Sequence, residues 1–375
     1  MKILTDSALL DVAGGIEWNT LQMATALADR GHQIRVVYAH DGPLRTRYER
    51  AGITLDGPVD FTFDARHPLA TSARFARSIV IARRFAPEVL WLNRVEHVQW
   101  AEAVAIGSRC RIVCQLHHPP RDLRESRLLG RVAHFVAVSA YVRDVWIAAG
   151  VSAKKITVIY NALPSQDYPY GDERERAEAR ERLGLPAEGA IVLSHGRISE
   201  DKGIGTLLDA WATLGLDSRE ALLVLVGSPS PFDVPALAAR LARLAPGTVR
   251  YVPAQEDVVP YLHASDVVVV PSVAPEAFGR VASEALTSGR PVVATRAGAL
   301  GEILAGPMSR FLVDRGDARQ LASRISSLLN WREAEPHLGE ECHVWATSTF
   351  PFEETTSRLE RALARVAHAP RRGRV

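Results

Sequence analysis

Two glutamates eight positions apart form the most specific chemical pattern in the sequence. Glu276 and Glu284 lie in the stretch 271–285, which follows an apolar segment at 266–270. We expect Glu276 in a loop and Glu284 inside the helix that begins near Gly279. Carboxylate oxygens accept hydrogen bonds from hydroxyl groups, and the amides at a helix start are unpaired. The stretch therefore predicts a site for a hydroxyl-rich ligand; the alternative is two solvated glutamates on a helix face.

Two cations, Arg197 and Lys202, follow another apolar segment, 190–194. Arginine donates hydrogen bonds through a planar fork and lysine supplies a compact point charge, so together they suit a diphosphate. Only four of the 45 basic residues are lysines, which favours a specific role for Lys202. The alternative is a pair of solvated surface cations.

A pair of glycines, Gly14 and Gly15, separates the first apolar segment from a helical pattern that includes Leu21 and Leu27. Amides at the start of such a helix can hold an anion. The pair is not the G-x-G-x-x-G fingerprint, because no third glycine follows at the required spacing, and this disfavours a nicotinamide dehydrogenase. A simple turn is the alternative for the two glycines.

Adjacent histidines, His117 and His118, end the apolar segment 112–116 and precede Pro119 and Pro120. The prolines prevent a regular strand from continuing, so at least one imidazole should face the loop end. A metal site is disfavoured, because neighbouring side chains of an extended segment point apart and the sequence offers no evident third ligand. A structural role for both histidines remains the alternative.

Short apolar segments alternate with amphipathic stretches along most of the chain, which indicates parallel sheets covered by helices on both faces. Turn residues at 161–171 and a charged run at 172–182, expected to be a solvated helix, interrupt this alternation. We therefore expect an N-terminal domain at 1–163, a linker at 164–186, a second domain at 187–350, and a C-terminal segment, 351–375, with a helix packing back on the first domain and a disordered basic tail.

The charge balance, the cysteines and the lengths of the apolar runs exclude several classes of protein. The 375 residues carry 45 basic and 43 acidic side chains, a net charge of +2, which argues against a protein that coats nucleic acid. Three cysteines in no metal or disulfide spacing indicate a reducing compartment, and no apolar run is long enough to span a membrane, so we expect a cytoplasmic protein. The excess of arginine over lysine, with abundant alanine, indicates a GC-rich bacterial genome.

These motifs together resemble the retaining glycosyltransferases of family 4, which have the GT-B fold. The resemblance spans nearly the whole chain and is most specific in the Glu-x7-Glu pattern from Glu276 to Glu284, with Phe278 and Gly279 inside it. It implies an α/β protein with two Rossmann-like domains facing each other across a cleft. The N-terminal domain would bind the acceptor and the second domain a nucleotide sugar.

The resemblance also assigns roles to residues. Arg197 and Lys202 would neutralise the donor diphosphate, with Gly14 and Gly15 approaching it, and Glu284 would bind the ribose. Glu276 and the backbone of Ala277, Phe278 and Gly279 would hold the transferred sugar, and His117 rather than His118 would lie at the reacting centre. The catalytic set is then His117, Glu276, Arg197 and Lys202, without a metal or other cofactor, and the residues expected at the acceptor are Asn93, Arg94, Glu96 and His118.

The expected reaction transfers a hexose or N-acetylhexosamine from a UDP-sugar, or second a GDP-sugar, to a small acceptor such as a sugar, cyclitol or natural-product intermediate. A GT-B-like nucleotide-sugar epimerase and a non-catalytic nucleotide-sugar-binding protein are the alternatives. No nucleic acid partner is expected, and the protein would be a monomer or homodimer. The amphipathic segment 69–85 allows membrane association, but a crossover helix with solvated arginines explains it equally well.

Overall fold

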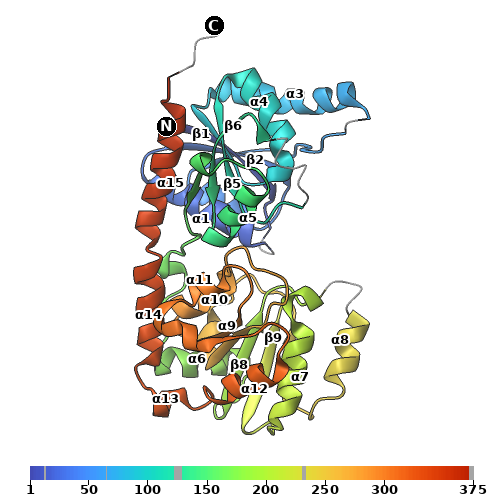
Figure 1. Ribbon diagram of the computed structural model, residues 1–375, viewed down its shortest axis with the longest axis vertical. Helices are drawn as coiled ribbons and strands as arrows, with labels where there is room; N and C mark the ends of the chain where they lie inside the picture. Colours follow the sequence, from blue (N-terminus) through green and yellow to red (C-terminus); the bar gives the residue numbers. More distant parts are fainter. Residues whose placement is uncertain (12–13, 65, 122–128, 230–233, 371–375) are drawn as a thin grey trace. The chain divides into compact units, whose positions relative to one another are not determined.

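The computed structural model describes residues 1–11, 14–64, 66–121, 129–229 and 234–370. The chain divides into two compact units (Figure 1). The first contains Met1–Asn161 and the chain from Glu353 on, and the second contains Ala162–Phe352. The segment expected as a linker, 164–186, thus lies in the second unit. The basic tail, 371–375, lies outside the described residues.

The first unit is built on a parallel sheet with the strand order β3-β2-β1-β4-β5-β6-β7. Its strands are β1 (Lys2–Leu9), β2 (Gln33–His40), β3 (Thr54–Asp56), β4 (Val89–Leu92), β5 (Arg111–Leu116), β6 (Val132–Ala137) and β7 (Ile156–Val158). Its α-helices are α1 (Gly15–Asp29), α2 (Arg45–Arg50), α3 (Pro68–Phe85), α4 (Val98–Ser108), α5 (Ala140–Ala148) and α15 (Phe352–Ala367).

The second unit repeats this plan with the strand order β10-β9-β8-β11-β12-β13, again all parallel. Its strands are β8 (Ala190–His195), β9 (Ala221–Val226), β10 (Val249–Val252), β11 (Val267–Val270), β12 (Val292–Thr295) and β13 (Leu312–Val313). Its α-helices are α6 (Glu173–Leu183), α7 (Ile204–Leu214), α8 (Val234–Leu241), α9 (Val259–Ala264), α10 (Arg280–Thr287), α11 (Leu300–Ile303), α12 (Ala318–Ser326), α13 (Trp331–Ala334) and α14 (Leu338–Thr349).

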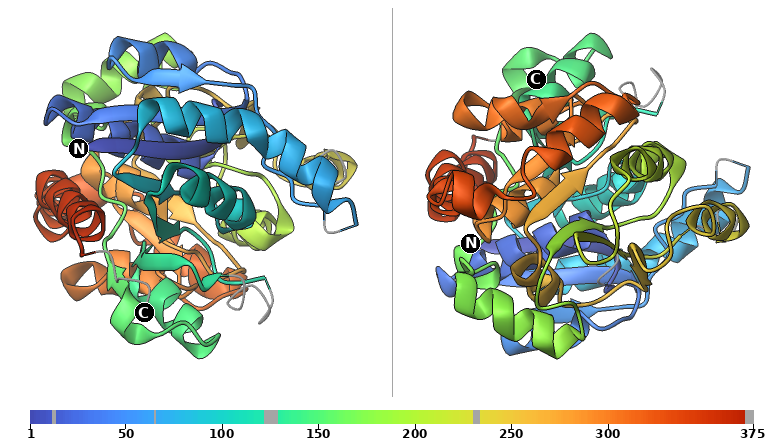
Figure 2. Two further views of the ribbon diagram at one scale, coloured as in Figure 1. Left: turned by 90° about the horizontal axis from the view of Figure 1, so that it is seen from above. Right: turned by 90° about the horizontal axis from the view of Figure 1, so that it is seen from below.

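Each sheet begins at a central strand, β1 or β8, and successive strands are added toward one edge. The chain then returns to the centre, at β4 or β11, and adds the remaining strands toward the opposite edge. Right-handed crossovers consequently place helices on both faces of each sheet (Figure 2). The central strands are covered on both sides, which explains why β9 and β11 are uninterrupted apolar runs whose residues are all buried. Ligand sites in such sheets lie beyond the carboxyl ends of the strands, where the winding direction changes.

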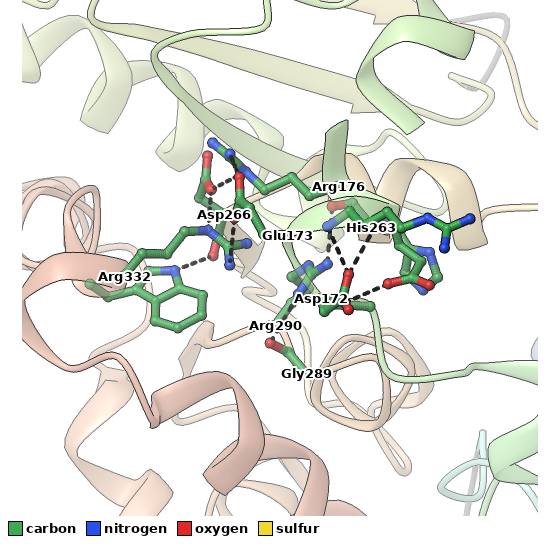
Figure 3. Close-up of polar contacts among 12 residues, drawn as sticks. Asp172, Glu173, Arg176, His263, Asp266, Gly289, Arg290 and Arg332 are labelled. Carbon is green, nitrogen blue, oxygen red and sulfur yellow. Dashed lines mark hydrogen bonds and ion pairs between the residues drawn. The ribbon is translucent and has the colours of Figure 1, made fainter. Parts of the chain in front are cut away.

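Buried arginines tie the start of the second unit to its sheet. The carboxylate of Asp266, just before β11, accepts hydrogen bonds from Arg180 Nη2 at 2.7 Å and from Arg176 Nε and Arg332 Nε at 3.0 Å (Figure 3). Arg176 and Arg180 belong to α6, whose other charged residues are mostly exposed, as the charge pattern predicts for a solvated helix. Arg180 is instead 1% exposed.

A second buried arginine, Arg290, fastens the chain just before α6. It donates to the carbonyl oxygens of Leu262, His263 and Gly171 at 2.8–3.0 Å (Figure 3). Burial lowers the pKa of Arg290 to about 9. Its charge lies at the carboxyl end of α9, where the unpaired carbonyls of a helix favour a cation.

Candidate functional site

The change of winding direction in the second sheet lies between β8 and β11. The loops that follow these two strands contain the predicted cations and the first predicted glutamate. Gly203 ends the β8 loop with a positive φ of 74°, and a side chain there would overlap the carbonyl of Pro271 in the β11 loop. The two loops are therefore in direct backbone contact, and only glycine permits this approach.

Lys202 and Glu276 meet across these loops. Lys202 Nζ donates to Glu276 Oε1 at 2.6 Å, and the hydroxyl of Ser272 donates to the same oxygen. The lysine side chain is 34% exposed and the glutamate side chain 16%. Since an ammonium group has three donors, Lys202 can bind an anion while it holds Glu276.

The backbone of Glu276 is held by the loop after β12. Its amide donates to the carbonyl of Ala297 at 3.3 Å, and its carbonyl accepts from the amide of Ala299 at 2.9 Å. Gly298 lies between these partners with a φ of 58°, and a side chain there would overlap the Glu276 backbone. Three neighbouring strand ends therefore fix the position of this carboxylate.

The residues after Glu276 lead into α10 as the sequence predicts. Ala277 is half-buried, and Phe278 is buried with its ring 6.1 Å from that of Phe350. Gly279 precedes the helix with a φ of 101°, a conformation that favours glycine. Only residues 277–279 therefore separate Glu276 from the start of α10.

Arg197 differs from Lys202, although both lie in the β8 loop. Its Nη2 donates to Asp201 Oδ2 at 2.7 Å, and its side chain is 58% exposed. Asp201 also joins the two loops, since its backbone carbonyl accepts from the amides of Val273 and Ala274. The structure therefore joins Lys202 directly to Glu276 but pairs Arg197 with a different carboxylate.

Glu284 lies in a buried polar cluster inside α10. Its Oε1 accepts from Arg280 Nε at 2.7 Å and from the Tyr168 hydroxyl at 3.0 Å, and Arg280 Nη2 donates to that hydroxyl at 2.9 Å. His195 Nε2 is 3.6 Å from Glu284 Oε2, and burial lowers the pKa of His195. A neutral imidazole therefore faces the second carboxylate oxygen.

In the first sheet the winding direction changes between β1 and β4. The loop after β1 ends at Gly14, and α1 begins at Gly15, so the two glycines lie at a helix start as predicted. Glu17 in the first turn of α1 is 3% exposed and forms an ion pair with Arg94, which follows β4. The arginine of the predicted acceptor set thus already has a carboxylate partner.

Asn93 and Asp6 form a buried network at the same place. The Asn93 amide donates to Asp6 Oδ1 at 2.7 Å, and Asn93 Nδ2 donates to the Thr5 hydroxyl at 2.7 Å. The other Asp6 oxygen is 2.7 Å from Nδ1 of His97, whose ring stacks on Phe61. Asn93 consequently positions the backbone of this loop.

Glu96 lies between two cationic or polar side chains, those of His118 and Arg121. Its Oε1 is 3.2 Å from Nε2 of His118 and 2.6 Å from Nη2 of Arg121. Burial alone would raise the pKa of Glu96, but the hydrogen bond from His118 and the charges of His118 and Arg121 lower it to about 2. This carboxylate is therefore charged at neutral pH.

The two adjacent histidines have different surroundings. His117 is buried, and burial with the nearby charges of His118 and Arg94 lowers its pKa to about 3, so its imidazole is neutral. Among the described residues its Nε2 has no hydrogen-bond partner, whereas both ring nitrogens of His118 lie within 3.2 Å of an oxygen.

Beyond β4 and β5 lie buried polar atoms that have no hydrogen-bond partner in the part of the chain that the structure describes. They are Asn93 Oδ1, Arg94 Nε, Glu96 Oε2 and His117 Nε2. Such atoms are costly in a folded protein unless a ligand or water satisfies them. All four come from residues that the sequence predicts for the acceptor or the reacting centre.

Two family models match the chain, one for each unit. The model for "Glycosyltransferase Family 4" matches residues 13–166, and the model for "Glycosyl transferases group 1" matches residues 189–330. The chain belongs to the family 4 glycosyltransferases.

Relatives of this family 4 chain include several D-inositol 3-phosphate glycosyltransferases. The Nocardioides protein is 35% identical over 199 residues, which cover 47% of this chain and 43% of the relative. The Streptomyces scabiei protein is 33% identical over 234 residues, 59% of this chain and 51% of the relative. The chain thus spans about half the length of the curated relatives that it matches.

Solved structures match the whole family 4 chain. Anabaena HepE in complex with UDP-glucose has a TM-score of 0.83 at 25% identity, covering 97% of this chain and 99% of HepE. A glycosyltransferase from Rickettsia africae has a TM-score of 0.85 at 18% identity, covering 98% and 99%. The predicted GT-B class, with two parallel-sheet α/β domains, is confirmed.

Three residues next to the predicted site were missed by sequence reasoning. Asp6 and Tyr168 left no signal in the sequence spacing, because each reaches its partner from a distant part of the chain. Arg280 precedes Glu284 by four positions, a helical spacing that could have indicated the pair. Among the residues described, no group of three or more His, Cys, Asp or Glu side chains is arranged to hold a metal ion, and no helix is long and apolar enough to cross a membrane.

Proposed function

We propose that this protein is a retaining glycosyltransferase that moves a hexose or N-acetylhexosamine from a UDP-sugar to a hydroxyl group of a small acceptor. The Lys202–Glu276 pair, held at the point where the second sheet changes winding direction, is the observation that carries the proposal. It combines a cation for the leaving phosphate with a carboxylate for sugar hydroxyls. The membership of the family and the UDP-glucose complex of Anabaena HepE support the same donor class.

The proposed mechanism needs charge stabilisation rather than a protein nucleophile. Loss of the sugar leaves negative charge on the β-phosphate, and Lys202 with Arg197 and the helix-start amides would stabilise it without a metal. Arg197 would exchange Asp201 for the phosphate, since their ion pair is exposed and therefore weak. The acceptor hydroxyl would attack from the face that the phosphate leaves, with a phosphate oxygen taking its proton, which retains the anomeric configuration.

The ribose and the sugar would be bound by different groups. The Oε2 atom of Glu284 would accept from the ribose hydroxyls, and the amides that follow Glu276 would bind the sugar. His117 would hydrogen-bond the transferred sugar through its unpartnered Nε2, as a neutral group.

The acceptor would be a hydroxyl-rich compound such as a sugar or cyclitol. The four unpartnered atoms beyond β4 and β5 include both donors and acceptors, which matches hydroxyl groups. The name of the curated relatives, D-inositol 3-phosphate glycosyltransferase, supports a cyclitol.

Sugar transfer by a Lys202→Ala variant tests the proposal. We expect the turnover of a UDP-sugar with a panel of sugar and cyclitol acceptors to fall about a hundredfold or more. The variant lacks the ammonium group that would stabilise the negative charge on the departing diphosphate. Lys154→Ala, an exposed lysine of the first unit, is the matched control. Near-normal turnover of Lys202→Ala would contradict the diphosphate assignment, and conversion of the nucleotide sugar without any acceptor would identify an epimerase instead.

A further inference from the structure

An open pocket of about 860 Å³ lies in the first unit, away from the residues discussed so far. Its walls come from α4, the turn before β5, the start of β5 and β6, the turn before β7 and the end of α15. Because these strands are parallel, the pocket lies at their amino ends, whereas the candidate site lies beyond their carboxyl ends. A six-residue strand separates the two edges by roughly 20 Å.

The pocket is strongly basic. It is lined by five cationic side chains, Arg109, Arg111, Arg131, Lys155 and Arg365, and by one carboxylate, Glu102. This excess of positive charge is local, because the whole chain has a net charge of only +2.

Three of these cations have neutral partners. Arg111 donates to the carbonyls of Val366, Ala369 and Pro370, and Lys155 Nζ is 3.3 Å from the carbonyl of Val132. In the part of the chain that the structure describes, Arg111, Lys155 and Arg365 form no ion pair. Their charges are therefore not compensated by a carboxylate partner, although the hydrogen bonds hold the side chains in place.

Arg365 is held by a histidine that does not compete for an anion. Its Nη2 lies 2.8 Å from Nε2 of His134. Burial and the neighbouring Arg365 lower the pKa of His134 to about 4, so the imidazole is neutral and accepts this hydrogen bond. A neutral imidazole does not offset the charge of the guanidinium at the pocket wall.

We propose that this pocket binds a compact small molecule that carries several phosphate groups. The five cations come from separate segments around the pocket, so a polyanion with several charged groups matches them better than a single phosphate. The concave shape favours a small molecule over a flat membrane surface. Such a ligand would join Arg365 of α15 to Lys155 and Arg131 at the sheet edge, and would strengthen the attachment of α15 to its unit.

Binding of tripolyphosphate, measured by calorimetry at low salt with the full chain, tests this proposal. Lys154 and Lys155 are exposed neighbours, but only Lys155 lines the pocket. We expect saturable binding that Lys155→Glu weakens about fivefold or more and Lys154→Glu changes less than twofold. Arg131→Glu should act like Lys155→Glu, and tripolyphosphate should raise the Tm of the unmodified protein.

Several outcomes would overturn the proposal. Absence of saturable binding would do so, and so would equal weakening by Lys154→Glu and Lys155→Glu, since that would show attraction to the general surface charge. Binding to vesicles with anionic lipid that depends on Lys155, without binding of tripolyphosphate, would instead assign the pocket to a membrane surface. Circular dichroism of each variant establishes that it is folded.

Discussion

His117 shows at the scale of a single residue how burial sets chemistry. The sequence indicates that one of two adjacent histidines faces a ligand, and spacing alone cannot distinguish them. The structure gives them different surroundings: burial keeps His117 neutral, with an Nε2 that no other described residue binds, while His118 lies against the ionised Glu96. A sequence cannot supply this difference, because it depends on the residues that pack around each ring.

The buried state of His117 predicts a dependence of stability on pH. Its pKa is about 3 in the folded protein and about 6.5 in an unfolded chain, so the unfolded state binds more protons between these values. The free energy of unfolding therefore falls as the pH drops from 6.5 toward 3. His117→Gln should reduce this slope by up to about 1.4 kcal/mol per pH unit.

Urea unfolding at a series of pH values measures this slope. His134→Gln is a useful comparison, because the pKa of His134 is about 4 and its contribution should end near that pH. A slope that is the same in His117→Gln and the unmodified protein would show that this imidazole is protonated in the folded state.

Tyr168 gives a second prediction at the residue scale. Its hydroxyl donates to Glu284 and accepts from Arg280, so Tyr168→Phe should loosen the carboxylate that we assign to the ribose. We expect KM for the nucleotide sugar to rise about threefold to tenfold while kcat changes little, because a single hydrogen bond of this kind contributes about 1 kcal/mol. Steady-state kinetics measures both values, with the exposed Tyr170→Phe as the matched control. A fall in kcat at constant KM would place Tyr168 at the reacting centre instead.

At the scale of elements, most strands and helices follow from apolar periodicity, and the exceptions have physical reasons. The strands β3 and β13 were missed because they have only three and two residues at sheet edges, too few for a pattern. The helix α6 was expected to be solvated because glutamate and arginine interleave along it. Most of the helix is exposed, but Arg176 and Arg180 bind Asp266, a partner that lies about ninety residues further along the chain and that the charge pattern does not reveal.

The Asp266 cluster yields a prediction about α6 and β11. Asp266→Asn would leave Arg176, Arg180 and Arg332 without their shared carboxylate. Removing one partner from a buried ionic group destabilises a protein by about 3–5 kcal/mol. Denaturant unfolding measures this loss, and Asp144→Asn, which breaks an exposed pair with Arg143, should cost less than about 1 kcal/mol. Similar small effects of both substitutions would show that the cluster contributes little.

At the scale of the whole molecule, the first unit is discontinuous in the sequence, because the second unit is inserted between two of its segments. The first unit contains both the beginning of the chain and its last helix, α15. Arg30 of the first unit donates to Glu353 and Glu360 of α15. Leu359 and Leu363 of the same helix are buried. The fold class follows from the alternation of strands and helices, but the division of the chain depends on these long-range contacts.

Leu363→Ala tests the dependence of the first unit on α15. The side chain is fully buried, so we expect a loss of about 2–5 kcal/mol that is confined to the first unit. Native-state hydrogen exchange should show faster exchange in β1 and β2 and unchanged exchange in β9 and β11. Arg361→Ala, on the exposed side of the same helix, serves as control. Equal acceleration in both units would show that they unfold together.

The position of α15 also sets an order in time during synthesis. A ribosome releases β1 to β7 long before it reaches Glu353, yet Leu359 and Leu363 complete the apolar interior of that same unit. The intervening residues, 162–352, can fold as soon as they have emerged, because domains generally fold as units. The unit that is made first is consequently finished last, and until then it exposes an uncovered apolar face that a chaperone could recognise.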